Sequence, residues 1–215
     1  MLDTIILLTG RVEYPFLASA LREHNPQLNL CPAVTAADLS ALAPQTLRRA
    51  RMVAFATDVI VTADMLEQLG FGAYNFHTGP PCFPGWRPAH FAVHRGAKEF
   101  GVTAHVMIEK VDAGPIVGVE SFAVPDRITV QGLEELTYAS LARLFHRLAR
   151  PLAMQSEPLP ELPERWSGRK TTRRDLAAIR GIPPDVSKDE LNRRLDEIST
   201  PGWLLAVSIA PRRQQ

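Results

Sequence analysis

This sequence has little cysteine and no excess of one charge. Cys31 and Cys82 are its only cysteines, which are too few for a disulfide framework and are not spaced as metal ligands. Lys and Arg number 24 against 23 Asp and Glu, which leaves a formal net charge of +1. This balance gives no electrostatic reason to expect nucleic acid or an anionic membrane as the main partner.

Long hydrophobic runs are missing as well. The first ten residues, MLDTIILLTG, have no basic stretch, and their apolar run is too short for a signal peptide or a membrane span. We therefore expect a cytoplasmic protein with no membrane partner. His90 and His94 have a spacing that can bind zinc, but no third ligand accompanies them. We interpret them as surface or packing residues and expect no metal.

What the sequence does contain is a regular alternation of apolar runs and amphipathic segments. Strands are predicted over residues 4–8, 28–34, 51–61 and 73–77, and helices over residues 14–25, 35–50, 62–70 and 88–97. Pro44 is expected to break the second helix, and Thr62 is a candidate to cap the third. The alternation predicts an α/β fold with a doubly wound, mostly parallel sheet.

The second half of the chain adds two more strands and a long helix. The strands are predicted in residues 101–124, and an amphipathic helix over residues 131–153 should cover the sheet. After Met154 the composition becomes rich in Pro and Glu, which is typical of a linker. We therefore divide the chain into a domain of residues 1–154 and a linker with a short C-terminal helix-strand extension, residues 155–215. That extension contains SKDELNRRLDEI, with a capping box from Ser187 to Glu190, and a strand candidate, PGWLLAVSI.

Polar side chains stand at the end of the fourth predicted strand, in AYNFHTGPP. Asn75 and His77 are two residues apart and therefore project from one face, while Tyr74 and Phe76 project from the other. Ligands of open α/β sheets bind where the strands end. The pattern alone leaves two interpretations open, a binding site or a pair of side chains that hydrogen-bond the following turn.

Three features, taken in order, resemble the formyltransferase family that uses 10-formyltetrahydrofolate. They are N-x-H at Asn75 and His77, the proline-rich loop GPPCFPGWRP, and VDAGPIV at the end of the segment that begins GVTAHVM. The resemblance covers residues from about 51 to 124 well, the first strand and helix weakly, and the tail only as a faint likeness to sugar N-formyltransferases. It implies a Rossmann-like fold. Thr78 stands where the family usually has proline, which makes the loop less rigid.

The resemblance implies a catalytic trio of Asn75, His77 and Asp112. Attack of an amine on a formyl carbon builds negative charge on oxygen, which N–H groups of Asn75 and His77 could stabilise. Asp112 would favour a protonated His77, and it could also take the proton from the attacking ammonium. The sequence does not assign the base between these routes. Asp112 could in addition be the Asx-turn residue of D-A-G-P.

The resemblance also implies where the pterin ring of 10-formyltetrahydrofolate lies, in an apolar slot recognised mostly by backbone groups. The matching positions form two segments, Asp58, Val59, Ile60 and Val61 before the Asn75 strand, and Ile108, Glu109, Lys110 and Val111 before Asp112. Asp58 has an equal alternative as a turn residue that caps Val59.

Several other polar residues have two interpretations. His105 lies near the site in the family, but we interpret it as a satisfied, half-buried histidine. Trp86 and Arg87 could touch the acceptor or form a packed loop tip. The run RKTTRR, residues 169–174, could meet a phosphate or an anionic sugar nucleotide, although we favour a solvated charge run.

The acceptor is inferred by elimination. The segment LTGRVEYP has no G-x-G-x-x-G, no P-loop and no glycine/serine loop of the kind that cradles phosphate in glycinamide-ribonucleotide formyltransferases. The tail is shorter than the C-terminal β-barrel of methionyl-tRNA formyltransferases, and with the balanced charge this argues against tRNA. A folate-dependent N-formyltransferase for a small amine, such as a nucleotide-linked amino sugar, fits best. The alternatives are a formyltetrahydrofolate hydrolase and a folate-binding module without catalysis. The oligomeric state stays open, with a homodimer as one option.

Overall fold

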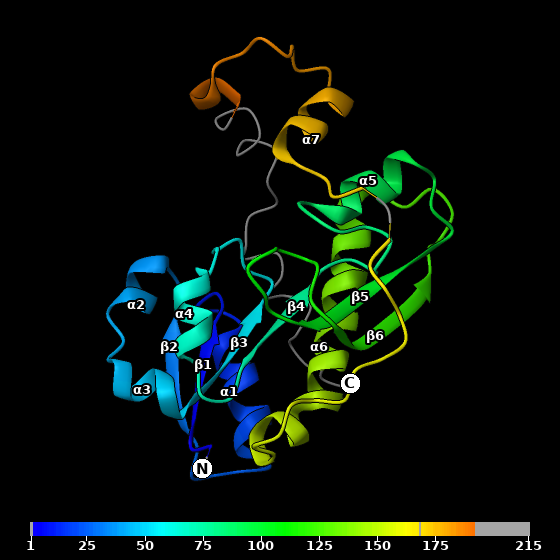
Figure 1. Ribbon diagram of the computed structural model, residues 1–215. Coiled ribbons are helices and arrows are strands. Elements are labelled where there is room, and N and C mark those ends of the chain that lie inside the picture. The colour runs from blue at the N-terminus through cyan, green and yellow to red at the C-terminus, as the bar shows by residue number, and fades with distance from the viewer. Residues whose placement is uncertain (1, 168, 192–215) are drawn as a thin grey trace.

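The structure, a computed structural model, describes residues 2–167 and 169–191 and has a six-stranded sheet between two layers of helices (Figure 1). The strand order is β2-β1-β3-β4-β5-β6, in which the first four strands are parallel and the last two are antiparallel to their neighbours. The strands are β1 (Thr4–Leu8), β2 (Asn29–Ala33), β3 (Ala50–Phe55), β4 (Ala73–His77), β5 (Glu99–Val106) and β6 (Ile116–Ala123). The predicted α/β, doubly wound, mostly parallel and Rossmann-like sheet is confirmed.

Helices cover both faces of this sheet. On one face lie α1 (Tyr14–Arg22) and α6 (Val130–Met154), and on the other lie α2 (Ala36–Ser40), α3 (Pro44–Arg49) and α4 (Ala63–Gln68). Successive residues of β1 alternate between the two cores, as the two-residue period of a strand requires, with Ile5 and Leu7 in the first and Ile6 and Leu8 in the second.

Aromatic side chains fill the core between β3, β4 and α6. The rings of Phe55, Phe76, Tyr138 and Phe145 have centroids 5.2–5.9 Å apart, mostly in edge-on arrangements that suit their charge distribution. Burying each such side chain stabilises the fold by about 1.5–3 kcal/mol. This packing holds the carboxyl ends of β3 and β4 in fixed positions under α6.

The clearest departures from the sequence prediction lie at the end of β3 and at the start of α4. The strand predicted over residues 51–61 ends at Phe55, because Ala56 has a left-handed φ of 47° and the chain leaves the sheet there. Thr62 precedes α4, but its side chain makes no capping hydrogen bond. Pro44 opens a new helix, where its missing N–H is tolerated, so the predicted break is confirmed.

The chain after α6 returns along the β6 side of the sheet toward the end where α5 (Pro88–His94) and α7 (Arg173–Ile179) lie (Figure 1, yellow). The Leu162 N–H donates to the Ile116 carbonyl of β6 at 2.7 Å, which fixes this course.

The predicted division at residue 154 coincides with the end of α6 and stays a prediction. The Ser187 hydroxyl accepts the Glu190 N–H at 3.2 Å. The segment PGWLLAVSI lies outside the described residues.

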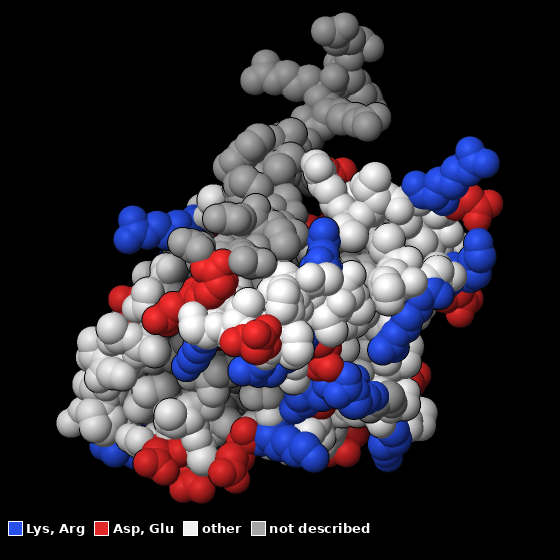
Figure 2. All heavy atoms as spheres, turned by 90° about the horizontal axis from the view of Figure 1, so that it is seen from above, with Lys and Arg blue, Asp and Glu red and all other residues white. Residues whose placement is uncertain are grey.

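The end of the sheet that points upward in Figure 1 carries charges of both signs. Viewed from above, Lys and Arg side chains are interspersed with Asp and Glu side chains on the atoms that are described (Figure 2). This mixed surface agrees with the formal net charge of +1.

Arg51 places a fully buried charge (0% exposed) at the base of β3. Its guanidinium donates to the carbonyl oxygens of Leu152 at 2.8 Å, Glu157 at 3.1 Å and Phe71 at 3.2 Å. The same group lies 5.5 Å from the centroid of the Tyr74 ring. Arg51 therefore joins β3 to the end of α6 and to the segment that follows it.

We predict that Arg51→Met lowers the free energy of unfolding by about 3 kcal/mol or more, because several buried carbonyl groups lose their donor. Arg51→Lys should lower the free energy of unfolding by less than Arg51→Met, because the lysine ammonium still donates to some of the carbonyl groups that the guanidinium binds. Urea denaturation measures both values. Arg49→Met is the control, because Arg49 is exposed and pairs with Asp3 at the surface. A loss for Arg51→Met no larger than that of the control would contradict the role assigned to Arg51.

Candidate functional site

A cavity of about 660 Å³ opens at the carboxyl ends of β3 and β4. Its size lies in the range of small-molecule sites, about 300–1,000 Å³. Parts of the chain that are far apart in sequence line it: the loop after β3, the end of β4, the loop before α5, the segment after β5, and α6. Lys170, Thr171 and Arg173, which follow α6 in the chain, complete the lining.

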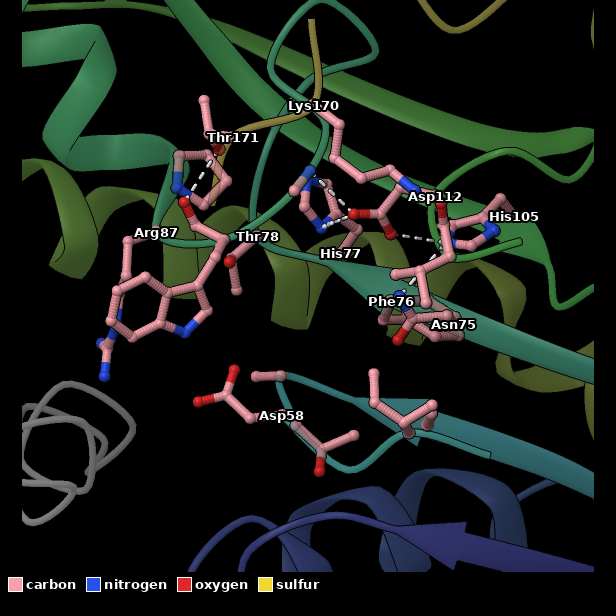
Figure 3. A pocket seen from close by; sticks show the side chains of 18 of the residues that line it. Asp58, Asn75, Phe76, His77, Thr78, Arg87, His105, Asp112, Lys170 and Thr171 are labelled. Atoms are coloured by element: carbon pink, nitrogen blue, oxygen red, sulfur yellow. Dashed lines mark hydrogen bonds and ion pairs between the residues drawn. The ribbon is translucent and has the colours of Figure 1, made fainter. Parts of the chain in front are cut away.

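The Asp112 carboxylate lies between the rings of His77 and His105 at one side of this cavity (Figure 3). The distances are 3.6 Å from His77 Nδ1 to Asp112 Oδ2 and 3.4 Å from His105 Nε2 to Asp112 Oδ1. Asn75 Nδ2 lies 3.1 Å from His105 Nε2. The structure thus brings together the three residues proposed as a trio, Asn75, His77 and Asp112, and adds His105 as a fourth.

Backbone carbonyl groups determine which nitrogen of each ring carries a proton. His77 Nε2 lies 3.1 Å from the Phe83 carbonyl oxygen, and His105 Nδ1 lies 2.9 Å from the Val106 carbonyl oxygen. A carbonyl oxygen only accepts, so each of these two nitrogens donates. The remaining nitrogens, His77 Nδ1 and His105 Nε2, face Asp112 and are the positions where a further proton can bind.

Burial lowers the pKa of His77 below its ordinary value, and the attraction of the Asp112 carboxylate opposes this only in part. His105 and Lys170 lower the pKa of His77 further. The sequence led us to expect that Asp112 would favour a protonated His77. Asp112 does act in that direction, but burial of the ring outweighs the carboxylate, so the neutral form of His77 predominates at pH 7.

Asp112 is ionised in the same surroundings. Burial alone would raise its pKa, but His77, His105 and the backbone N–H of Gly85 together lower the pKa of Asp112 to about 2. The Gly85 N–H donates to Asp112 Oδ2 at 2.8 Å. This contact, with the loop before α5, differs from the Asx-turn role considered for Asp112.

The turn that carries Asp112 is tight. Asp112 has a left-handed φ of 46°, a conformation that Asp and Asn adopt more readily than most other residues with a side chain. Two residues later, a Cβ on Gly114 would lie 1.9 Å from the Val106 carbonyl oxygen. Gly114 therefore lets the turn approach the end of β5 closely enough to place Asp112 beside His105.

Most positions expected to contact folate line the cavity. Of the eight, six do: Asp58, Val59, Ile60, Ile108, Lys110 and Val111. Ile60, Ile108 and Val111 are large apolar side chains that stay 64%, 42% and 41% exposed, so this wall offers an apolar surface to a ligand. Such a wall fits the flat aromatic ring of a pterin.

The other two positions lie outside the lining. Val61 is buried in the core under α4, where the chain turns back into the fold, and Glu109 is exposed.

Asp58 lies across the cavity from His77 (Figure 3). The turn role considered for Asp58 belongs to Thr57, whose hydroxyl accepts the Val59 N–H at 3.2 Å.

Sequence reasoning undervalued both His105 and the segment after α6. The interpretation of His105 as a satisfied histidine agrees with its hydrogen bonds, but the ring is only 3% exposed rather than half-buried, and it contacts both Asp112 and Asn75. The cross-strand pairing of Asn75 with His105 could have identified it, but that register is a property of the folded sheet. The favoured interpretation of residues 169–174 as a solvated charge run fits only Arg169, Thr172 and Arg174, which are exposed, whereas Lys170, Thr171 and Arg173 line the cavity.

The remaining candidates are placed as follows. Trp86 and Arg87 line the cavity, while His90 is buried between Glu134 at 3.6 Å and Arg180 at 2.9 Å. Among residues 2–167 and 169–191, no group of three His, Cys, Asp or Glu side chains could hold a metal ion. No helix in this described part of the chain is long and apolar enough to cross a membrane.

Comparison with known proteins shows which family this chain is similar to. The model of the family described as formyl transferase matches residues 41–143, which hold Asn75, His77, His105 and Asp112. Over about half of its length, the chain is thus similar to the formyltransferase family. Within that family, a methionyl-tRNA formyltransferase of Streptococcus agalactiae is 32% identical over 150 residues, which is 65% of this chain and 43% of the relative. The chain spans about half the length of the curated formyltransferases that it matches.

Solved formyltransferase structures share the fold. A sugar N-formyltransferase from a Shewanella species has a TM-score of 0.70 at 15% identity, with 89% of this chain and 86% of that chain covered. A formyltransferase from Anoxybacillus kamchatkensis, solved with UDP-4,6-dideoxy-4-formamido-L-AltNAc and tetrahydrofolate, has a TM-score of 0.64 at 17% identity, with 85% and 92% covered.

Proposed function

We propose that this protein is a folate-dependent N-formyltransferase, which moves a formyl group from 10-formyltetrahydrofolate to a small amine. The observation that carries the proposal is the meeting of Asn75, His77, His105 and Asp112 at one side of a cavity that also has exposed apolar side chains in its lining. The family match supports it, as do structural neighbours solved with folinic acid or tetrahydrofolate.

The cavity suits both the pterin ring and the formyl group of the folate. Ile60, Ile108 and Val111 form the exposed apolar wall that would hold the pterin, and the loop backbone at residues 57–60 offers polar groups at its edge. When bound, 10-formyltetrahydrofolate supplies the formyl carbon. Asn75 lines the cavity beside His77, and its amide N–H is a donor for negative charge that develops on a carbonyl oxygen.

The lowered pKa values of His77 and Asp112 favour His77 as the first proton acceptor. His77 Nδ1 is unprotonated in the neutral ring, and the ionised Asp112 lies 3.6 Å away. A proton taken from the attacking amine would convert His77 to a cation that pairs with Asp112. Because Asp112 and two histidines share the site, the proton belongs to the cluster, and a pH profile would report apparent pKa values of the group.

The acceptor we favour is a nucleotide-linked amino sugar. Arg87, Lys170 and Arg173 line one part of the cavity, and they suit the phosphate groups of such a molecule, whereas Glu134 in the same lining suits its amine. Sugar N-formyltransferases among the structural neighbours support this choice. The curated relatives are methionyl-tRNA formyltransferases, so tRNA is a second candidate acceptor.

Release of tetrahydrofolate from 10-formyltetrahydrofolate, measured with a panel of amino-sugar nucleotides and with aminoacylated initiator tRNA, tests the function. The proposal expects release that depends on an added amino-sugar nucleotide. Release without any amine would indicate a hydrolase, and tight folate binding without turnover would indicate a binding module. Dependence on the tRNA alone would replace the proposed acceptor.

We also predict that a non-reactive formylfolate slows amide hydrogen exchange in residues 58–61, since the ligand covers this loop. Hydrogen-exchange mass spectrometry compares the free and bound protein. Residues 36–40, which form α2, serve as the internal control because none of them lines the cavity. Folate binding with unchanged exchange in residues 58–61 would place the pterin elsewhere.

A further inference from the structure

The chain after α6 is bonded to the loop that supports the site. We call Trp166, Ser167 and residues 169–171 the strap. The Ser167 N–H donates to the Pro81 carbonyl at 3.0 Å, and the Thr171 N–H donates to the Pro84 carbonyl at 3.0 Å. The Trp86 N–H returns a hydrogen bond to the Thr171 carbonyl at 3.0 Å. These bonds attach the strap to both ends of residues 81–86.

The loop held in this way touches the two central groups of the site. Its Phe83 carbonyl accepts from His77 Nε2 at 3.1 Å, and its Gly85 N–H donates to Asp112 Oδ2 at 2.8 Å. The strap thus lies one hydrogen bond beyond the groups that orient His77 and Asp112. The family match, residues 41–143, ends before the strap begins.

Trp166 makes the most direct contacts of the strap with the site. The centroid of its ring lies 5.0 Å from that of His105 and 5.7 Å from that of His77, with interplanar angles of 87° and 72°. The indole N–H donates to the Gly114 carbonyl at 2.8 Å. One side chain therefore contacts the end of β4, the end of β5 and the turn that carries Asp112.

We propose that Trp166 is a positioning residue for the formyl-transfer site, which keeps water away from the His77–Asp112–His105 cluster and holds the two rings at the carboxylate. It does not line the cavity, so it acts through the histidines rather than on a substrate. The expected effect of Trp166 on turnover rests on the proposed function. The expected effect of Trp166 on the pKa of His77 does not, because it can be measured without a substrate.

The physical basis is the burial of His77. Water excluded by the indole would otherwise solvate a protonated ring and favour it. The charged and titratable groups that act on His77 are Asp112, which favours the cation, and His105 and Lys170, which oppose it. With Trp166 replaced by alanine, water reaches the ring while Asp112 stays, so the pKa of His77 should rise.

The test is a titration of the histidine ring protons by NMR in the full-length protein, with the His77 signal assigned by its loss in His77→Gln. Trp166→Ala should raise the pKa of His77, move the acid limb of the kcat profile to higher pH, and lower kcat by about tenfold or more. Trp166→Phe, which keeps an aromatic ring against both histidines, should restore much of each property. Arg165→Ala is the matched control, because Arg165 is the exposed neighbour of Trp166.

An unchanged pKa of His77 in folded Trp166→Ala would overturn the proposal, and so would equal effects of Arg165→Ala. If Trp166→Ala does not fold, Trp166→Leu takes its place, since it keeps an apolar side chain but puts no ring against the histidines. A shifted pKa with no formyl transfer by the wild type would leave the role of Trp166 standing and count against the proposed function alone.

Discussion

The variant His77→Ala is expected to lower kcat for formyl transfer by at least about a hundredfold, the usual cost of removing a group that stabilises or relays charge in a transition state. His77 is buried at the side of the cavity, its Nε2 is held by the Phe83 carbonyl, and its Nδ1 faces the ionised Asp112. Stopped-flow or steady-state release of tetrahydrofolate measures the loss.

His94→Ala is the matched control for this variant. His94 lies on α5 in the same region of the chain but is exposed and does not line the cavity. We expect it to keep near-normal turnover. Near-normal turnover in His77→Ala, with the protein folded and binding folate, would remove His77 from the chemistry.

The variant Asp112→Asn is expected to lower kcat by about 10²–10⁴-fold while folate binding changes little. Asparagine accepts the left-handed φ of 46° and keeps the size of the side chain, so the turn should survive. What is lost is the negative charge between the two histidine nitrogens, and with it the partner of a protonated His77. Loss of folate binding equal to the loss of kcat would instead indicate a role in shaping the turn.

The same variant tests the charge of Asp112 through stability. The pKa of Asp112 is about 2 in the folded protein against 3.8 for a free side chain, so folding favours the ionised form. The contribution, about 2 kcal/mol, is complete above about pH 5 and is lost as the pH falls toward 2. The difference in unfolding free energy between wild type and Asp112→Asn should therefore shrink between pH 5 and pH 2. A difference that does not depend on pH would contradict the assigned charge.

Local patterns in the sequence predict the sheet and half of the site. Strands such as Thr4–Leu8 are continuous apolar runs, and Asn75 and His77 share a face because the strand period is two residues. The end of β3 was misplaced because Thr57, Val59 and Ile60 suit a strand, while the left-handed turn at Ala56 depends on tertiary context.

The parts of the site that the sequence does not reveal all depend on contacts between distant residues. His105 meets Asn75 through the register of two antiparallel strands, and Trp166 meets His77 across 89 residues of chain. The neutral state of His77 also depends on this packing, because the competition between burial and a neighbouring carboxylate is decided by how completely water is excluded.

A crystal structure of the protein with a non-reactive formylfolate tests the central claim most directly, which is that these side chains surround one formyl group. The account predicts a formyl oxygen within about 3.2 Å of the side-chain nitrogen of Asn75, with the pterin against Ile60, Ile108 and Val111. A folate bound with its formyl group remote from Asn75, His77 and Asp112 would contradict the account.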